Sequence, residues 1–276
     1  MILKSLLPIF LVAVFLNADN LENKVLEFEK KRFSQNPRVE LNKLSVFMKK
    51  ELSQKGWYGF IVDIEATMAG NKVNAKDVVF TNGEVVTSEL YDLTSGKSLK
   101  DVMTPKLTDK YYDKKRLIAG NHNAKDKIVI FSDPLCPFCM DYVPDVIKHV
   151  KKYEDKIALY YYHFPLLSIH PAAAPLVRLM AKAKEDGITN IEEKVYSIYW
   201  DEKFSSKENN ADVIIKAFNK EFKTSYTQKD INSKRVGEEI FEDVKMGEDV
   251  LVQGTPTVFI NGEQDKSKLK YEMLGK

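Results

Sequence analysis

Cysteine is scarce in this sequence of 276 residues, which contains only two, at positions 136 and 139. A chain with one closely spaced pair does not use disulfides as a stabilising framework, so the pair is expected to serve a chemical purpose. An excess of one charge is also lacking, because 42 Lys and Arg residues are balanced by 40 Asp and Glu residues. Without a concentrated basic patch, nothing in the composition indicates a nucleic-acid partner.

An apolar run from position 6 to position 16 follows a lysine-containing start. The tripeptide Leu16-Asn17-Ala18 is a candidate cleavage site before Asp19, although Leu16 is larger than the small residue preferred there. Residues 1–18 therefore resemble a secretory signal peptide. The alternative is an uncleaved membrane anchor, for which the run is short beside the about 20 residues that cross a bilayer.

The two cysteines stand between a predicted strand and a predicted helix. Residues 128–131 form an apolar run rich in β-branched side chains, and residues 143–150 carry apolar side chains at helical spacing. Pro137 suits the first helical position, because its missing N–H has no intrahelical partner there. Cys136 is thus expected at the helix N-terminus, where free N–H groups and the helix dipole favour the nucleophilic thiolate. Cys139 is close enough to attack a mixed disulfide at Cys136, which is the layout of a thiol–disulfide exchange centre.

Two other interpretations of the pair stay open. The cysteines could form half of a zinc site, but a structural zinc site needs four ligands, and no histidine has a zinc-knuckle spacing to them. The histidines are His122, His149, His163 and His170. The pair could also be a structural disulfide, although so short a loop restrains little chain entropy. No metal site is expected.

The motif Cys136-Pro137-Phe138-Cys139, between a strand and a helix, resembles the active site of the thioredoxin superfamily. The segment Gly254-Thr255-Pro256, which leads into an apolar run, resembles the second hallmark of that superfamily, its cis-proline loop. The resemblance implies that Cys136 and Cys139 are catalytic and that Pro137 and Phe138 tune the redox potential. It also implies that Pro256 follows a cis bond and packs against the cysteines, and that Thr255 and Pro256 bind the substrate chain.

Residues 19–105 are predicted to form a small domain of helix and antiparallel sheet. Residues 21–28 have the spacing of a short helix, and apolar residues at positions 41, 44, 48 and 52 indicate a second helix closed by Gly56. Residues 60–67 alternate between apolar and polar, as a half-buried strand does. Asn82-Gly83 between two apolar runs predicts a hairpin.

A module of this size has a thin core and open sheet edges, both of which a second copy would cover. Residues 79–97 resemble the cystatin-like N-terminal dimerisation domain of the bacterial DsbC/DsbG isomerases. That resemblance implies a homodimer with two facing thioredoxin domains. The alternative is a monomer in which the first domain is a docking surface.

Residues 106–123 alternate between charged and apolar side chains and are predicted to form a linker helix, where the DsbC/DsbG type has its connecting helix. Such a helix would act as a semi-rigid spacer. Residues 124–276 are predicted to form the catalytic domain, a thioredoxin fold with a helical insertion at about 165–230. The expected fold class is therefore α+β in the first domain and α/β in the second.

Departures from the family pattern bear on the direction of the redox reaction. Ile130 occupies the position, six residues before the first cysteine, where thioredoxins and DsbA-type oxidases tend to carry a buried acid. Ile130 and Thr255 both resemble the DsbC/DsbG branch, and Pro137-Phe138 is closer to the Pro-Tyr of DsbG than to the Gly-Tyr of DsbC. His163 and His170 end a strand and enter a loop, where histidine is usually a surface or half-buried polar residue.

These patterns predict an exported, periplasmic thiol–disulfide oxidoreductase. It is expected to act as a disulfide isomerase or reductase on misfolded or newly exported cysteine-containing proteins, with a DsbD-like membrane reductase as its redox partner. One alternative is a DsbA-like dithiol oxidase served by a DsbB-like oxidase. Another is a holdase-type chaperone with secondary redox activity. No cofactor is implied in any of these cases.

Overall fold

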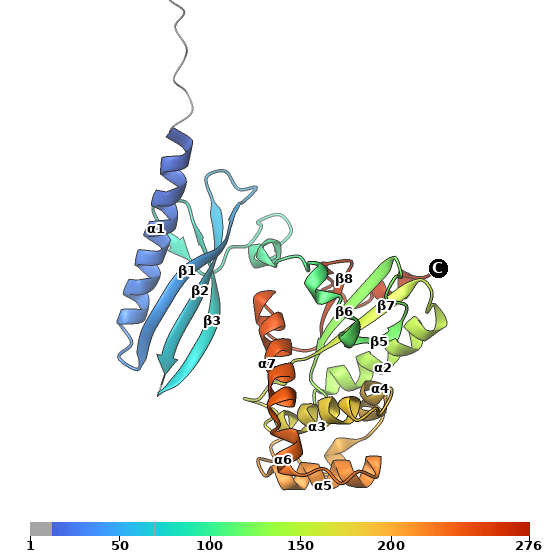
Figure 1. The fold of residues 1–276 in the computed structure, drawn as a ribbon. Coiled ribbons are helices and arrows are strands. Elements are labelled where there is room, and N and C mark those ends of the chain that lie inside the picture. Colours follow the sequence, from blue (N-terminus) through green and yellow to red (C-terminus); the bar gives the residue numbers. More distant parts are fainter. Residues whose placement is uncertain (1–12, 69) are drawn as a thin grey trace, which may run out of the picture. The chain divides into compact units, whose positions relative to one another are not determined.

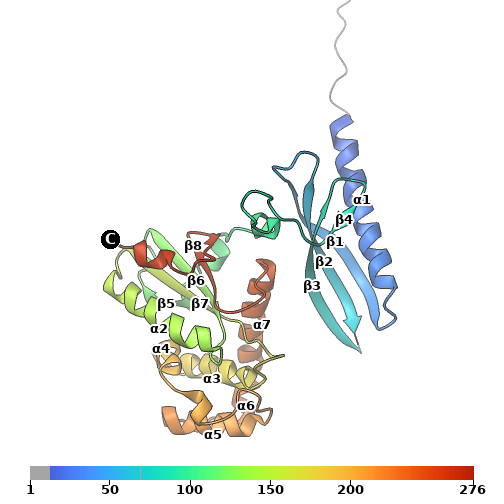
Figure 2. The same ribbon diagram turned by 180° about the vertical axis from the view of Figure 1, so that it is seen from behind.

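The computed structural model describes residues 13–68 and 70–276 of the chain. The chain forms two compact units, one that ends at Thr104 and one that begins at Pro105 (Figure 1; Figure 2 shows the reverse side). Of the predicted signal peptide, residues 1–18, the first twelve lie outside the described residues. The first helix begins at position 13. Among the helices that the structure describes, none combines the length and the apolar character of a membrane span.

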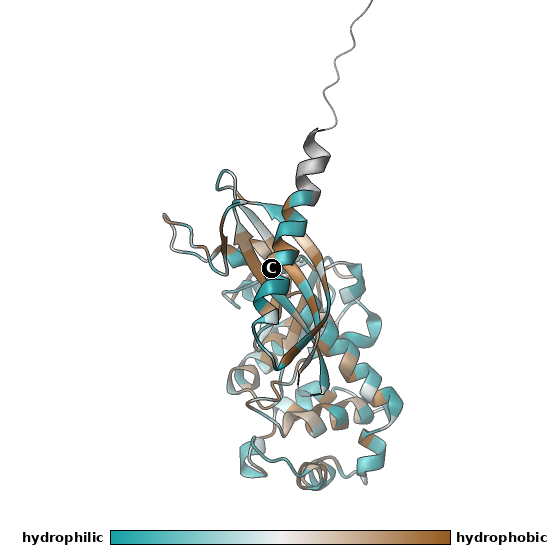
Figure 3. Ribbon diagram, turned by 90° about the vertical axis from the view of Figure 1, so that its left-hand side faces the viewer, coloured by the Kyte–Doolittle hydropathy of each residue, from teal (hydrophilic) through white to brown (hydrophobic). Residues whose placement is uncertain are grey.

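The first unit is a helix packed on an antiparallel sheet. The helix is α1 (Ala13–Ser34), and the sheet has the order β1-β2-β3-β4. The strands are β1 (Val39–Glu51), β2 (Tyr58–Met68), β3 (Asn71–Thr81) and β4 (Val86–Thr87). Alternate residues of β2, from Phe60 to Ala66, pack with Val25 of the helix, and Figure 3 shows largely hydrophobic strands behind the mostly hydrophilic outer side of α1. The predicted alternation in β2 and the hairpin at Asn82-Gly83 are confirmed.

The helix predicted over positions 41–52 is wrong, because these residues belong to strand β1. The strand has two register shifts, between Leu41 and Lys43 and between Val46 and Met48. A bulge adds one residue to a strand, so side chains three apart can point to the same face. Leu41 and Leu44 pair with residues 66 and 64 of β2 in this way. Their spacing therefore imitated the period of a helix.

The second unit is built on a five-stranded sheet of order β5-β7-β6-β8-β9. The strands are β5 (Leu117–Gly120), β6 (Asp126–Ser132), β7 (Ile157–His163), β8 (Thr257–Ile260) and β9 (Glu263–Gln264). Strands β6 and β7 are parallel, and the other neighbouring pairs are antiparallel. Ile128 and Ile130 of β6 belong to one core, with α2 (Pro137–Lys152), while Val129 and Phe131 belong to a second core on the opposite face.

Helices separate β7 from the last two strands. They are α3 (Ala173–Glu185), α4 (Ile191–Tyr196), α5 (Ala211–Phe222), α6 (Gln228–Ile231) and α7 (Lys234–Asp249). The first three share the core of α2, through residues such as Leu176, Val195 and Phe218, all fully buried. This is a thioredoxin fold with a helical insertion, as predicted.

The predicted linker helix over residues 106–123 is wrong. This segment contains two short 3₁₀ turns, at Asp109–Tyr111 and Lys114–Arg116, and then strand β5 of the second unit. Tyr111 is buried against the rings of Phe131 and Tyr162, and its hydroxyl donates to the Met246 carbonyl at 3.0 Å. The apolar residues of the segment thus belong to the core of the sheet, and these tertiary contacts override the local helical pattern.

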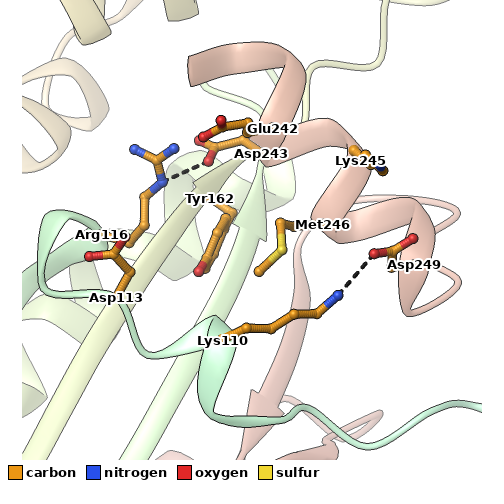
Figure 4. Close-up of a pocket in the computed structure, with 9 residues that line it drawn as sticks. All are labelled: Lys110, Asp113, Arg116, Tyr162, Glu242, Asp243, Lys245, Met246 and Asp249. Carbon is orange, nitrogen blue, oxygen red and sulfur yellow. Dashed lines mark hydrogen bonds and ion pairs between the residues drawn. The ribbon is translucent and has the colours of Figure 1, made fainter. Parts of the chain in front are cut away.

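A pocket of about 320 Å³ lies between this segment and α7 (Figure 4). Two ion pairs join its walls: Arg116 Nε to Asp243 Oδ1 at 2.7 Å and Lys110 Nζ to Asp249 Oδ2 at 3.0 Å. Asp243 is fully buried and also accepts a hydrogen bond from the backbone N–H of His163, at 3.0 Å. Burial raises the pKa of Asp243 to about 7, although the Arg116 guanidinium opposes the shift.

Asp243 should therefore make the free energy of unfolding depend on pH. Its pKa of about 7 exceeds the ordinary value of 3.8, so the folded state keeps a proton that the unfolded chain has lost. The contribution of this group to stability falls as pH rises between about 4 and about 7, by at most about 1.4 kcal/mol per pH unit. Asp243→Asn, which keeps an acceptor for His163 N–H, is expected to remove this slope. Chemical denaturation at a series of pH values measures both proteins, and parallel curves would contradict the prediction.

Candidate active site

The two cysteines lie where strand β6 ends and helix α2 begins. The strand ends at Ser132, the chain turns through Asp133 and Leu135, and Cys136 is the N-cap of α2 with extended backbone angles, φ −78° and ψ 121°. Pro137 occupies the first turn of the helix, as its missing N–H permits. The strand–turn–helix arrangement predicted from the sequence is confirmed.

Cys136 is almost buried, at 5% exposed, and it faces several hydrogen-bond donors. The thiol of Cys139 and the backbone N–H groups of Cys139 and Phe138 all donate toward its sulfur. These bonds, led by that of the Cys139 thiol, outweigh burial and lower the pKa of Cys136 to about 5. Cys136 is therefore a thiolate at neutral pH, the form that attacks disulfides.

Cys139 has the opposite character. Its side chain is fully buried, and burial raises the pKa of its thiol well above the ordinary value of 9.0. The thiolate of Cys136 increases this shift, because Cys139 donates its hydrogen bond to that sulfur. The pair therefore shares one proton near neutral pH, with Cys136 as the charged, reactive sulfur and Cys139 as the protonated one.

The predicted proline loop lies beside the cysteines. The Thr255–Pro256 peptide bond is cis, as the resemblance implied, and Pro256 is buried. Cys136 Sγ lies 3.4 Å from the carbonyl oxygen of Thr255, to which the protonated thiol donates. Strand β8 begins directly afterwards and pairs with β6, which fixes the loop relative to the cysteine-bearing turn. The structure thus brings Cys136, Cys139 and Thr255 together across more than a hundred residues of chain.

Phe138, the second residue of the dipeptide between the cysteines, is 75% exposed. Its ring does not enter the core and is available to whatever approaches Cys136. A groove of about 710 Å³ runs along the same helix, between α2 and the residues that end α4. Met140, Pro144 and the 71% exposed Tyr199 are among its apolar lining residues.

Asp133, which the sequence analysis did not identify, organises the turn before Cys136. Its fully buried carboxylate accepts hydrogen bonds from the N–H of Leu135 at 2.8 Å, the N–H of Leu166 at 2.9 Å and Nδ1 of His170 at 2.9 Å. The bond to Leu135 is a local turn of a kind that Asp favours, and this was the one signal in the sequence. The carboxylate fastens the loop after β7 to the turn that carries Cys136.

The two histidines of that region differ. His170 is half-buried, as expected, and its partner is Asp133. His163 is buried, which corrects the expectation of a surface or half-buried residue, because it ends a strand whose seven residues are all buried. Burial lowers the pKa of His163 well below 6.5, so the ring is neutral. In residues 13–68 and 70–276, no group of three or more His, Cys, Asp and Glu side chains is arranged to hold a metal ion.

A thiolate at a helix N-terminus, a buried thiol one turn later and a proline loop beside them define a thiol–disulfide exchange centre on a thioredoxin fold. Residues 113–276 match the family model described as Thioredoxin, and the chain belongs to this family.

Curated proteins similar to this chain include two described as probable disulfide bond formation protein D. The one from Bacillus anthracis is 25% identical over 155 residues, which cover 52% of this chain and 68% of that protein. The one from Bacillus cereus is 24% identical with the same coverage. Among solved structures, DsbA2 of Pseudomonas aeruginosa is 18% identical, with a TM-score of 0.43, over 56% of this chain and 90% of that chain. Proteus mirabilis ScsC in a transitional conformation is 18% identical, with a TM-score of 0.45, over 60% of this chain and 72% of that chain.

Proposed function

We propose that this thiol–disulfide oxidoreductase is exported to the periplasm and acts as a disulfide isomerase on proteins that contain wrong disulfides. The different ionisation of the two cysteines carries the exchange chemistry, and the isomerase direction is supported by Ile130 and Thr255, which resemble the DsbC/DsbG branch. Cys136 is an ionised nucleophile at the surface end of the site, and Cys139 is a protonated thiol held in reserve behind it. Residues 1–18, with the features of a signal peptide, support export.

The first chemical step joins Cys136 to the client. The Cys136 thiolate attacks one sulfur of a client disulfide, a new S–S bond forms, and the other client sulfur leaves as a thiolate. In isomerisation, a client thiolate attacks the mixed disulfide and releases Cys136, so no net oxidation or reduction occurs. If Cys139 attacks instead, the client leaves with two thiols and the enzyme holds the Cys136–Cys139 disulfide, which a DsbD-like membrane reductase would then reduce.

The surroundings of Cys136 suit clients of many sequences. The backbone carbonyl of Thr255 lies next to the reactive sulfur, and backbone contacts hold an extended peptide without regard to its side chains. The exposed ring of Phe138 and the groove along α2 offer apolar surface on the other side. Misfolded proteins expose apolar segments, so this surface supports a role in handling them.

The first unit supports the proposal of a homodimer. Strand β1 is thirteen residues long and lies at the edge of the sheet, so among the described residues of the first unit one of its sides has no neighbouring strand. Long edge strands are usually covered in native proteins. A second copy of the chain would cover this one, and analytical ultracentrifugation measures whether it does.

A dithiol oxidase is the second candidate. The low pKa of Cys136 stabilises the reduced pair, which makes the corresponding disulfide more oxidising. The two Bacillus proteins, named for disulfide bond formation, agree with this direction. In that case the protein would receive oxidising equivalents from a DsbB-like enzyme and would meet its clients in the disulfide form.

The redox state of the pair in living cells separates these candidates. Cells are quenched with acid, free thiols are alkylated with a reagent that adds mass, and the full chain is detected on a gel. Isomerase or reductase function predicts a mostly reduced pair, and a mostly oxidised pair would overturn it in favour of the oxidase. The double variant Cys136→Ala, Cys139→Ala has no thiol to alkylate, so it marks the gel position of the unlabelled protein. The same variant tests the holdase alternative, which anti-aggregation activity retained without the cysteines would support.

A further inference from the structure

Behind Cys139, three hydroxyl groups form a buried chain. Ser132 Oγ lies 2.6 Å from Tyr196 Oη, and Tyr196 Oη lies 3.0 Å from Tyr161 Oη. The Ser132 hydroxyl also acts as a donor toward Cys139 and lowers the pKa of its thiol, against the larger effect of burial. Ser132 and Cys139 are fully buried, and the two tyrosines are at most 3% exposed. The three hydroxyl-bearing side chains thus run from the buried cysteine into the fold, and Tyr196 also forms part of the wall of the groove along α2.

Each hydroxyl comes from a different element. Ser132 is the last residue of β6, Tyr161 lies in β7, and Tyr196 is the last residue of α4, within the helical insertion. Around them the core is apolar, with Ile130 and Val143 among its fully buried members. Burying three hydroxyl groups in such a core costs free energy unless each of them has a hydrogen-bond partner. Two of these partners are within the chain of hydroxyls, and the Cys139 sulfur is next to its Ser132 end.

The reaction of Cys139 requires hydrogen-bond donors that stabilise its thiolate. It must become a thiolate to attack the mixed disulfide, and its burial opposes this ionisation. Ile130, on the neighbouring strand, is apolar and supplies no charge or proton acceptor. The backbone N–H of Asp133 is the other donor to the Cys139 sulfur from this side.

The titratable groups facing Cys139 are few. Cys136 on α2 is bonded to the client in the mixed disulfide and then carries no charge, and Tyr161 and Tyr196 are neutral because burial raises the pKa of each well above 10.0. At a greater distance from Cys139, the Asp133 carboxylate is hydrogen-bonded to His170, and Glu192 of α4 forms an ion pair with Lys184 at 2.8 Å.

We propose that the Ser132–Tyr196–Tyr161 hydroxyl chain stabilises the thiolate of Cys139 and thereby sets the rate at which Cys139 resolves the mixed disulfide. The inference rests on the proposed exchange function and adds three positioning residues to it. It also gives the helical insertion a part in the chemistry, because Tyr196 is supplied by that insertion.

The chain works by turning its hydroxyl groups. In the mixed disulfide the Cys136 sulfur is no longer a thiolate acceptor, so the Cys139 S–H turns to Ser132 Oγ, and each hydroxyl donates to the next one away from the sulfur. When Cys139 ionises, Ser132 donates to the sulfur, Tyr196 donates to Ser132, and Tyr161 donates to Tyr196. Successive donors in one direction polarise each other, so the distant hydroxyls strengthen the bond at the sulfur.

No proton needs to pass through the chain. In the balanced step, Cys139–S⁻ attacks the sulfur of Cys136, the Cys136–Cys139 disulfide forms, and the client sulfur leaves with the electron pair. The proton lost by Cys139 is taken up through solvent by the departing client thiolate. The disulfide of the client is thereby reduced and the cysteine pair is oxidised.

Glutathione disulfide is a simple probe of the two steps. The reduced protein attacks it to form a glutathione adduct at Cys136, and Cys139 then resolves the adduct and releases glutathione. Rapid acid quenching and mass spectrometry of the intact full chain follow the appearance and the disappearance of the adduct. The appearance rate reports Cys136, and the disappearance rate reports Cys139.

Two substitutions at position 132 isolate the hydroxyl. Ser132→Thr and Ser132→Val add the same bulk, but only threonine keeps the hydroxyl. A hydrogen bond to a charged group is worth about 1.5–3 kcal/mol, so adduct resolution in Ser132→Val is expected to be about 10–100-fold slower than in Ser132→Thr. Equal resolution rates in the two variants would overturn the proposal, since a purely steric role of the side chain predicts equality.

A second pair of variants tests the chain beyond Ser132. Tyr196→Phe removes one hydroxyl and keeps the ring, and it is expected to slow resolution by about 2–5-fold. Tyr162→Phe is the matched control, because its buried hydroxyl donates to the Tyr111 carbonyl, at 3.0 Å, from another part of the core. The S–H stretching band of Cys139, recorded by Raman spectroscopy in a Cys136→Ser background, should shift with Ser132→Val and stay in place with Tyr162→Phe.

The outcomes separate this inference from the proposed function. If the adduct forms in every variant and resolves at the wild-type rate in Tyr196→Phe and Ser132→Val, the hydroxyl chain has no role and the exchange function stands. If the wild-type protein forms no adduct at Cys136, the exchange function fails, and the inference fails with it. Slow resolution in Tyr162→Phe as well would show a general loss of packing and would also overturn the inference.

Discussion

Replacing Cys136 by alanine is expected to abolish disulfide exchange, so that scrambled ribonuclease with this variant recovers no faster than in buffer alone. The expected loss is complete because Cys136 is the one sulfur of the chain that is both ionised near neutral pH and placed next to the proline loop. Cys139 cannot replace it, since its side chain is fully buried and its pKa is raised. The measurement is the return of ribonuclease activity with time.

The matched variant is Cys139→Ser, which leaves the nucleophile and removes the resolving thiol. It is expected to attack clients and to accumulate as a mixed disulfide, seen as a band of higher mass on a non-reducing gel. The trapped species should disappear when Cys136 is also replaced. Full ribonuclease rescue by Cys136→Ala would remove Cys136 as the nucleophile.

The largest expected effect on stability comes from Gly120→Ala, at the end of strand β5. Gly120 has φ +77°, and a Cβ atom there would lie 1.9 Å from the carbonyl oxygen of Ile157 and 3.0 Å from Val150 Cγ1. The left-handed backbone costs alanine about 1–2 kcal/mol, and overpacking adds about 1–3 kcal/mol. We expect the free energy of unfolding to fall by about 3 kcal/mol or more, measured by guanidinium denaturation.

Gly187 provides the control for the backbone contribution alone. It has a similar φ of +86°, but nothing lies within 4 Å of the position of its Cβ. Gly187→Ala should therefore cost only about 1–2 kcal/mol. Equal losses in the two variants would show that the close approach to Ile157 does not contribute.

The part of the site around the two cysteines could be predicted from the sequence, because all of its residues are close together along the chain. The strand, the turn, Pro137 and the two cysteines occupy positions 126–139, and each is recognised by a local rule. The second component, Thr255-Pro256, is distant in sequence and was placed through resemblance to the thioredoxin superfamily.

The errors arose where tertiary structure decides the local fold. Strand β1 carries bulges, and its apolar spacing imitated a helix. The segment before β5 is drawn into the sheet domain by Tyr111 and by the ion pair of Arg116 with Asp243, neither of which a local pattern reveals. Asp133 and the hydroxyl chain were missed for the same reason, since their partners are about 30 to 60 residues away.

The redox direction of the exchange centre and the oligomeric state of the first unit are separate questions that need separate measurements. The site geometry accounts for attack by Cys136 and resolution by Cys139, whichever redox direction operates in the cell. The direction depends on the redox partner, and the choice between isomerase and oxidase therefore rests on the in-cell redox state. The homodimer proposed from the edge strand β1 is a separate question with its own measurement.

The exchange chemistry depends on Cys136 being a stabilised thiolate in front of a protonated Cys139. The rate of alkylation of the reduced protein by iodoacetamide, measured from pH 4 to pH 9 with the modified residue identified by mass spectrometry, tests it directly. We expect modification of Cys136 alone, with a midpoint at about pH 5. A midpoint near the ordinary cysteine value of about 8.5, or equal modification of Cys136 and Cys139, would contradict it.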